Sequence, residues 1–547
     1  MKFSFLLAAA PALVAATNLP IIETNYGPVK GEASPYRDGV TVYKGIPFAA
    51  PPTGSKRWTA PAPPESWNDT LHATQFAPQC AQPYSEAGIF STGKNSTSED
   101  CLYLNIWTPT YNNTNSDTAA IQSLNLPVYV WIFGGRFEGG SGDVKTYDGT
   151  GLASKGIIVV TINYRLGAFG FLAHPDLSLE SGYNSSGNYG LLDQQFALRW
   201  VKENIAYFGG NASQVTVGGQ SAGSASALDM MFSPLSRDLI AGVISESGAR
   251  GPHDPATGSV ATSYNTKEEA ESFGVELLSS MNVSSIAELR GISMADLIAQ
   301  GQLMESGYFT GTPFASLYSG PPRWRPNIDG YVLPHGYGEA LRLNEHADVP
   351  VLTGNNKNEN DLQGAPSTVS EYKSFWATIF QNYTSEFLSL YPATSDPEAS
   401  TLSNQVLLDI ARTGTWDWAA KWTAGGAKSN VYTYFFTKVP AEDQESGVYH
   451  GAELWYTFNN IPYSDYSNVT WNATDYEVEA TVSEYWANFI RGGDPNEDGD
   501  GLAYFLPSTA SNRSTMWLGE ESGAGPIAQS EARVAFLRKW MSKLHEY

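Results

Sequence analysis

The residues best suited to do chemistry in this chain surround a serine in the pattern G-x-S-x-G, Gly219-Gln220-Ser221-Ala222-Gly223. The β-branched run Val215-Thr216-Val217 before it predicts a short strand, and the small residues Ser224-Ala225-Ser226 after it predict a helix start. A strand that turns so sharply into a helix leaves no room for side chains at positions 219 and 223, and it exposes the serine hydroxyl. In a chain with 52 glycines this pattern also arises by chance. The strand and helix expected on either side of it nevertheless favour Ser221 as nucleophile.

A serine hydroxyl needs a general base, and the base needs an orienting carboxylate. The strand, turn and helix around Ser221 are typical of α/β-hydrolases, in which the acid and then the histidine follow the serine. That order excludes His72 and His174, and among the later histidines it favours His450, which is flanked by Gly447 and Gly451 just after the strand-like segment 430–436. The remaining histidines lie in a Pro/Gly-rich loop, before the expected acid or in an amphipathic C-terminal helix pattern: His253, His335, His346 and His545.

The expected acid is Glu359, which follows the apolar run Val349-Pro350-Val351-Leu352 in a polar loop. Open α/β sheets carry their functional residues in such loops, at the ends of strands. Asp361 is the local alternative.

Several ordered motifs resemble the type-B carboxylesterases, the family that also holds cholinesterases and the large fungal lipases. They are Tyr43-Lys44-Gly45-Ile46-Pro47-Phe48-Ala49-Ala50-Pro51-Pro52, residues 98–107 (SEDCLYLNIW), Asn163-Tyr164-Arg165, Gly170-Phe171-Leu172 and residues 190–194 (GLLDQ). The resemblance covers nearly the whole chain, and its triad motifs fall on Ser221, Glu359 and His450. It implies an α/β-hydrolase fold with a large, mostly parallel central sheet flanked by helices. It also implies a buried structural ion pair between Arg57 and Glu99.

Two positions depart from the family pattern. Gln220 stands where the family usually has glutamate, and Arg136 replaces a small residue in the glycine loop after the strand-like segment 126–132. That loop supplies backbone N–H groups for an oxyanion, so we expect the donors to be Gly135, Arg136 and Ala222. The Arg136 guanidinium either faces the reacting centre, where it would bind an anionic substrate, or turns outward into an ion pair.

The supporting elements alternate between strands and helices without repeats. Residues 156–163 are typical of a buried strand, and Leu192, Phe196 and Trp200 have helical spacing. The 547 residues, of which 42% are hydrophobic, are enough to bury a large core. We expect one catalytic domain over residues 17–547.

Residues 1–16 combine Lys2 with the apolar run Phe3 to Val14 and a small-residue site, a pattern typical of a secretory signal peptide. No later run is long enough for a transmembrane anchor. In an oxidising compartment the two cysteines, Cys80 and Cys101, are expected to form a disulfide. The segment between them is short and mostly polar where lipases of the family carry an amphipathic lid, which favours an esterase.

N-x-S/T sequons add candidate glycosylation sites at Asn68, Asn95, Asn112, Asn184, Asn211, Asn282, Asn382, Asn468, Asn472 and Asn512. The net charge of −24 argues against nucleic acid and anionic membranes as partners. No metal site or cofactor is predicted, and the sequence does not indicate an oligomeric state.

The sequence therefore predicts a secreted serine hydrolase that cleaves a small carboxylic ester through an acyl-enzyme on Ser221. Two alternatives remain at this stage. One is an acyltransferase or lactone-processing enzyme of secondary metabolism that uses the same acyl-enzyme and excludes water. The other is a non-catalytic binding or adhesion member of the family, which would normally have lost a triad residue.

Overall fold

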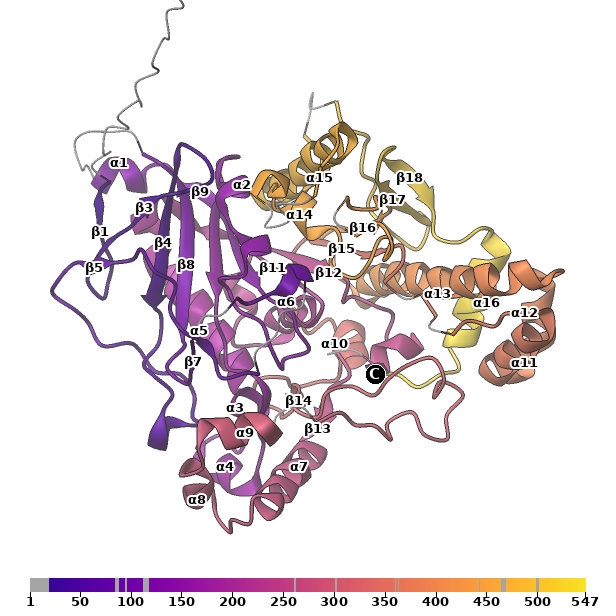
Figure 1. Cartoon of the computed structure of the whole chain (residues 1–547), viewed down its shortest axis with the longest axis horizontal. Coiled ribbons are helices and arrows are strands. Elements are labelled where there is room, and N and C mark those ends of the chain that lie inside the picture. Colours follow the sequence, from indigo (N-terminus) through magenta and orange to yellow (C-terminus); the bar gives the residue numbers. More distant parts are fainter. Residues whose placement is uncertain are drawn as a thin grey trace, which may run out of the picture.

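A mixed central sheet organises the chain (Figure 1). The computed structural model describes residues 19–83, 88–93, 96–111, 118–259, 262–300, 303–359, 361–362, 364–441, 443–463, 469–497 and 501–547. From one edge to the other, the strands of the sheet in this part of the chain are β18 (Gly523–Pro526), β17 (Ser514–Leu518), β16 (Val431–Phe436), β15 (Val351–Asn356), β12 (Gly242–Glu246), β11 (Gly210–Gln220), β9 (Leu126–Ile132), β10 (Ile158–Ile162), β8 (Tyr103–Pro109), β4 (Val40–Pro47) and β3 (Glu32–Ala33).

The sheet is parallel from β17 to β10 and antiparallel at both edges. All the residues of β10, β12, β15 and β16 are buried, as expected for strands covered by helices on both faces. The strands predicted before the glycine loop, Ser221, Glu359 and His450 are β9, β11, β15 and β16, and the buried-strand pattern of residues 156–163 is β10.

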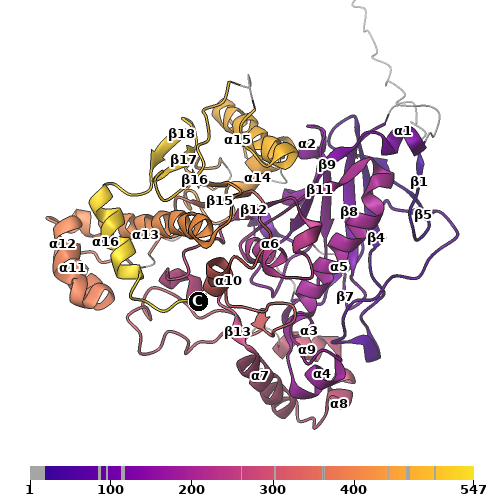
Figure 2. The same ribbon diagram turned by 180° about the vertical axis from the view of Figure 1, so that it is seen from behind.

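Helices cover both faces of the sheet. In the two opposite views, α2, α14 and α15 lie over one face and α5 and α6 lie against the other (Figures 1 and 2). The α-helices of the described residues are α1 (Thr118–Gln122), α2 (Thr150–Ala153), α3 (Gly167–Phe171), α4 (Pro175–Glu180), α5 (Tyr189–Asn204), α6 (Ala222–Phe232), α7 (Lys267–Ser280), α8 (Ile286–Arg290), α9 (Met294–Gln300), α10 (Tyr337–Leu343), α11 (Val369–Phe380), α12 (Thr384–Leu390), α13 (Asp396–Gly425), α14 (Leu454–Thr457), α15 (Ala473–Gly492) and α16 (Glu531–Met541).

Short strands form three small sheets outside the central one. They are β1 (Ile21–Glu23), β2 (Pro28–Lys30) and β5 (Leu71–His72), then β6 (Gln79–Cys80) with β7 (Thr97–Ser98), and β13 (Asn265–Thr266) with β14 (Asn327–Ile328). A separate, mainly aromatic cluster joins α11, α12, α13 and α16 through Trp376, Phe380, Phe387, Ile410 and Trp540. This cluster anchors the N-terminal half of α13, the helix that precedes β16 in the chain.

Two predicted structural pairs are confirmed. Arg57 is buried and forms an ion pair with Glu99 in which its Nε lies 2.7 Å from Oε2. Cys80 and Cys101 form a disulfide across 21 positions of sequence. The short helix Gly88–Phe90 inside this loop packs its Phe90 ring against Gly451, beside His450, so the disulfide braces one wall of the region around His450.

Some predictions fall on residues outside the described ranges, namely the signal peptide 1–16 and the sequons at Asn95, Asn112 and Asn468. Among the other sequons, the asparagines are exposed at Asn68, Asn184, Asn282, Asn382 and Asn472 and half-buried at Asn211 and Asn512. No helix in the described part of the chain has the length and apolar character needed to cross a membrane.

Removing the disulfide should destabilise the chain, because the bond restricts the unfolded ensemble. Replacing both Cys80 and Cys101 with alanine should lower the free energy of unfolding by about 3 kcal/mol, the entropy of closing a loop of this length. Chemical denaturation of the two proteins measures the difference, and peptide mapping without reduction should recover the two cysteines joined. A double variant as stable as the native chain, or two free thiols, would contradict the assignment.

Candidate active site

Ser221 stands at the turn between β11 and α6 with its backbone in the left-handed region, at φ 60° and ψ −124°. Close packing fixes this turn. A Cβ on Gly223 would lie 2.0 Å from the Ile132 carbonyl oxygen of β9, and a Cβ on Gly219 would lie 2.3 Å from the Gly223 carbonyl oxygen. Both glycines of G-x-S-x-G are therefore required sterically, as the sequence predicts. The Ser221 N–H donates to the Glu246 carbonyl at 2.9 Å, which ties the turn to β12.

His450 and Glu359 form the predicted acid and base pair. His450 Nδ1 lies 2.9 Å from Glu359 Oε2, and the carboxylate side chain is only 3% exposed. The sequence alternative, Asp361, instead accepts a hydrogen bond from Asn358 at 2.8 Å. Glu359 therefore carries the orienting contact, and its position fixes the proton of His450 on Nδ1 and leaves Nε2 with a lone pair.

Electrostatics favour an ionised Glu359 beside a basic imidazole. Burial acts to raise the pKa of the Glu359 carboxyl, but the hydrogen bond and charge of His450 and the nearby Arg250 guanidinium outweigh it, so that the pKa is lowered overall. Burial acts to lower the pKa of His450, and the Glu359 carboxylate outweighs this and raises it. The pair therefore stabilises the imidazolium that a general base must become.

The Gln220 side chain contacts the catalytic face of the imidazole. Its Nε2 lies 3.0 Å from His450 Nε2, and its Oε1 has no hydrogen-bond partner among the residues that the structure describes. With the His450 proton on Nδ1, the Gln220 N–H donates to the lone pair that would otherwise accept the Ser221 proton. Turning the amide over would place Oε1 against a protonated Nε2, so this neutral side chain can pair with either charge state of the base. The sequence identifies Gln220 as unusual but does not reveal this contact.

The glycine loop after β9 approaches the turn from the opposite side. A Cβ on Gly134 would lie 2.4 Å from the Gln220 carbonyl oxygen, and Gly135, Arg136 and Phe137 follow with φ of 92°, 59° and 62°. Arg136 thus adopts a left-handed conformation that a non-glycine residue holds only under constraint. Within the described residues, no acceptor binds the backbone N–H of Gly135, Arg136 or Ala222. The structure therefore leaves all three predicted oxyanion donors available.

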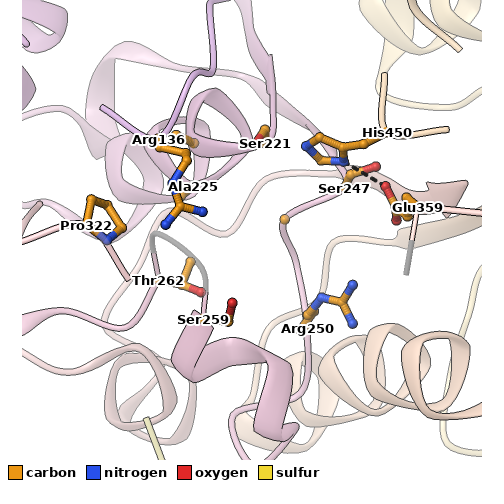
Figure 3. Close-up of a pocket in the computed structure, with 12 residues that line it drawn as sticks. Arg136, Ser221, Ala225, Ser247, Arg250, Ser259, Thr262, Pro322, Glu359 and His450 are labelled. Carbon is orange, nitrogen blue, oxygen red and sulfur yellow. Dashed lines mark hydrogen bonds and ion pairs between the residues drawn. The ribbon is translucent and has the colours of Figure 1, made fainter. Parts of the chain in front are cut away.

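A pocket of about 300 Å³ opens above Ser221 (Figure 3). Along with Ser221, Glu359 and His450 it is lined by Arg136, Ala222, Ala225, Ser247, Gly248, Arg250, Ser259, Thr262 and Pro322. Seven of these lining residues were not predicted from the sequence, namely Ala225, Ser247, Gly248, Arg250, Ser259, Thr262 and Pro322. Only Ser247 carried a usable signal, because it directly follows β12, a strand next to β11 and β15 in the sheet. The pocket lacks aromatic lining among the described residues and is rich in hydroxyl and guanidinium groups.

The Arg136 side chain combines both orientations considered from the sequence. It lines the pocket, its NH2 lies 3.3 Å from the Gly320 carbonyl oxygen, and its Nε forms a loose ion pair with Glu138 at 3.8 Å. The side chain remains 42% exposed. In Figure 3 its guanidinium extends from the loop toward Thr262 and Pro322. The charge therefore lies at the pocket rim, within reach of a bound molecule.

A second pair of carboxyl groups lies behind the triad. Glu246 accepts from Trp486 Nε1 at 2.9 Å, and Glu453 accepts from Asn356 Nδ2. Burial raises the pKa of both Glu246 and Glu453, and a neighbouring carboxylate adds to the effect in each case, Glu453 for Glu246 and Glu359 for Glu453.

Structural comparison places this fold among the α/β-hydrolases. A solved PNB esterase superposes with a TM-score of 0.74 and 28% identity, covering 95% of this chain and 99% of that one. The sequence model of the carboxylesterase family matches residues 18–536, and the chain belongs to this family.

Curated relatives are similar along nearly the whole chain. The fumonisin B1 esterase of Sphingopyxis macrogoltabida is 34% identical over 96% of this chain and 92% of that protein. The para-nitrobenzyl esterase of Bacillus subtilis (strain 168) is 31% identical over 94% and 97%. The acetylcholinesterase of Electrophorus electricus is 31% identical over 88% and 81%. The chain is thus a carboxylic ester hydrolase, which argues against the non-catalytic alternative.

The contact between Gln220 and His450 leads to a pH prediction. If His450 is the general base, ester cleavage needs its neutral form, so kcat/KM should fall as the pH drops through the raised pKa of this histidine. In Gln220→Glu, a carboxylate next to Nε2 would stabilise the imidazolium further and move the acid limb to higher pH by about one pH unit.

Gln220→Met is the matched control, because it removes the amide without adding charge. Its acid limb should stay close to that of the native enzyme in the same pH–rate measurement. An acid limb that does not move in Gln220→Glu would show that the 3.0 Å contact does not persist in the working enzyme.

Proposed function

We propose that the chain is a secreted serine esterase that hydrolyses small carboxylic esters through an acyl-enzyme on Ser221. The observation that carries this proposal is the shared pocket, in which the Ser221 turn and the His450–Glu359 pair line one cavity of about 300 Å³. Each group comes from the carboxyl end of a neighbouring parallel strand or from a loop that follows one. No cofactor is required by this chemistry.

The first half-reaction forms the acyl-enzyme. Ser221 Oγ attacks the ester carbonyl carbon while His450 Nε2 takes the hydroxyl proton, and the N–H groups of Gly135, Arg136 and Ala222 hold the oxyanion. The carbonyl re-forms as the bond to the alcohol oxygen breaks, and His450 returns its proton to that oxygen. Glu359 stays ionised throughout and stabilises the imidazolium.

The second half-reaction releases the acid. A water molecule gives its proton to His450 as it attacks the acyl carbon, the oxyanion forms again, and Ser221 leaves with the returned proton. The Gln220 amide must first release Nε2, since the same lone pair accepts the proton in both halves. Catalytic hydrogen bonds often tighten only when substrate is bound, which fits this requirement.

Secretion is supported by three independent features of the sequence and fold. Residues 1–16 have the composition of a signal peptide, and the disulfide between Cys80 and Cys101 fits an oxidising compartment. Exposed sequon asparagines, such as Asn68 and Asn382, offer acceptors for glycans.

The pocket chemistry favours polar esters over long apolar ones. Ser247, Ser259 and Thr262 contribute hydroxyls, and Arg136 contributes a cation at the rim. The relatives named as fumonisin B1 esterase and para-nitrobenzyl esterase support an ester of a small molecule as substrate. We infer that an ester with a carboxylate or phosphate near the scissile bond is preferred.

Loss of either reacting side chain should abolish turnover. Ser221→Ala and His450→Ala should each lower kcat by about three to six orders of magnitude, because the two act as one unit. Glu359→Gln should lower it less. His335→Ala, a histidine outside the pocket, is the matched control and should keep native turnover.

These rates are measured on a panel of esters with and without an added alcohol acceptor. Native turnover in Ser221→Ala, or no stoichiometric labelling by an organophosphonate, would overturn the acyl-enzyme. Product ester that forms only when alcohol is added, with no acid released, would assign the site to acyl transfer.

Replacing Arg136 tests the substrate preference separately. Arg136→Gly removes the rim cation and relieves the left-handed backbone, so kcat/KM should shift from anionic toward neutral esters by about tenfold, the scale of one charge-assisted hydrogen bond. Matched pairs of neutral and anionic esters with one leaving group provide the measurement. Equal changes on both members of a pair would show that Arg136 does not recognise substrate charge.

A further inference from the structure

A second cavity is lined in part by Lys357, two positions before Glu359 in the chain. Its volume is about 900 Å³, against about 300 Å³ for the catalytic pocket. One wall is a single face of α13, where Thr401, Leu408 and Arg412 follow one another at helical spacing. The opposite wall includes Phe435 near the end of β16 and Trp517 of β17. The cavity thus lies beside α13 and the yellow strand β17 of Figure 1.

The lining is largely apolar. Leu402 and Leu408 on α13 are only half-buried, and the Trp517 ring is half-buried as well. The rings of Phe435 and Trp517 meet edge to face with their centroids 5.3 Å apart. A hydrocarbon chain or ring placed here would remove these side chains from water.

The two guanidinium groups of the lining, on Arg412 and Arg533, share one buried carboxylate. Asp409 is completely buried and pairs with Arg412 NH2 at 2.8 Å and with Arg533 NH1 at 3.5 Å. It also accepts from the Tyr391 hydroxyl at 2.9 Å and from Gln405 Nε2 at 2.7 Å. Asp409 therefore balances only one of the two buried cations.

The remaining positive charge is held at the cavity. Arg412 is 6% exposed, lies 4.6 Å from the Phe435 ring centroid, and has an Nε without a hydrogen-bond partner in the described chain. Burial lowers the pKa of this guanidinium, as expected for a cation that is incompletely paired. The exposed Lys357 adds a further cation to the lining.

Glu398 is the acidic residue of the lining, and its carboxylate is already hydrogen-bonded to backbone N–H groups. The Glu398 carboxylate accepts from the backbone N–H groups of Thr394 and Ser395 at 2.8 and 3.2 Å, in the capping box of α13. The cationic character of the cavity is also local, because the chain as a whole has a net charge of −24. An anion with an apolar body would match both parts of the lining.

We propose that this cavity is a binding site for an amphipathic carboxylate of the fatty-acid type. The carboxylate pairs with Arg412, with Lys357 nearby, and the hydrocarbon part packs against Leu402, Leu408 and Trp517. The site is separate from Ser221 and does not depend on the catalytic proposal.

Titration calorimetry with sodium decanoate tests the site on the full chain. Decanoate should bind, and decanol, which has the same chain without charge, should bind about tenfold or more weakly, the loss of one charge-assisted hydrogen bond. Arg412→Gln should weaken decanoate binding by a similar factor. Asp409 keeps Arg533, Tyr391 and Gln405 in that variant, so it remains paired.

Two further variants keep the test decisive. Leu402→Trp fills the cavity from a half-buried position and should abolish binding even if Arg412→Gln folds poorly. Arg538→Gln removes an arginine of α16 that does not line the cavity and should leave binding unchanged. The proposal is overturned if decanoate does not bind, or if binding survives Leu402→Trp. It is also overturned if Ser221→Ala abolishes binding, which would assign the ligand to the catalytic pocket.

Discussion

The contact between the Ser221 turn and strand β9 is the constraint on which the rest of the site depends. Gly223 packs against the Ile132 carbonyl so closely that a methyl group could not be accommodated, and Gly134 packs against the Gln220 carbonyl from the other side. The turn and the glycine loop are therefore fixed to each other by backbone contact alone. Such contact holds both Ser221 and Arg136 in left-handed conformations that cost about 1 to 3 kcal/mol each when unsupported.

The parallel sheet extends this constraint to the acid and the base. Strands β9, β11, β12, β15 and β16 are consecutive neighbours, so the loops at their carboxyl ends meet along one edge. The strand pairing that brings these loops together is long-range in sequence, because the glycine loop and His450 are more than 300 positions apart. Acidic side chains also meet here, because Glu246 ends β12 and Glu453 precedes α14, and burial together with nearby carboxylates raises the pKa of both.

The sequence predicts those features that local patterns and chain order determine. Strand and helix periodicity identifies β11 and α5, the glycine spacing identifies Ser221, and the order of serine, acid and histidine selects His450. It does not predict side-chain directions, which depend on packing between distant segments. The Gln220 amide on His450 Nε2 and the partial exposure of Arg136 at the rim are of this kind. The walls at Ser259, Thr262 and Pro322 had no signal, because irregular loops leave no periodic pattern.

The division between strand ends and loops has a consequence for redesign. The reacting groups are held by the sheet, whereas Ser259, Thr262 and Pro322 belong to connecting segments that contribute no strand to it. Exchanging those segments would alter the size and polarity of the cleft while the attacking and proton-transferring atoms keep their places. The reacting groups are thus fixed by the sheet, while the loops that line the pocket can be exchanged. Grafting other loops at these positions would change substrate selectivity at little risk to folding.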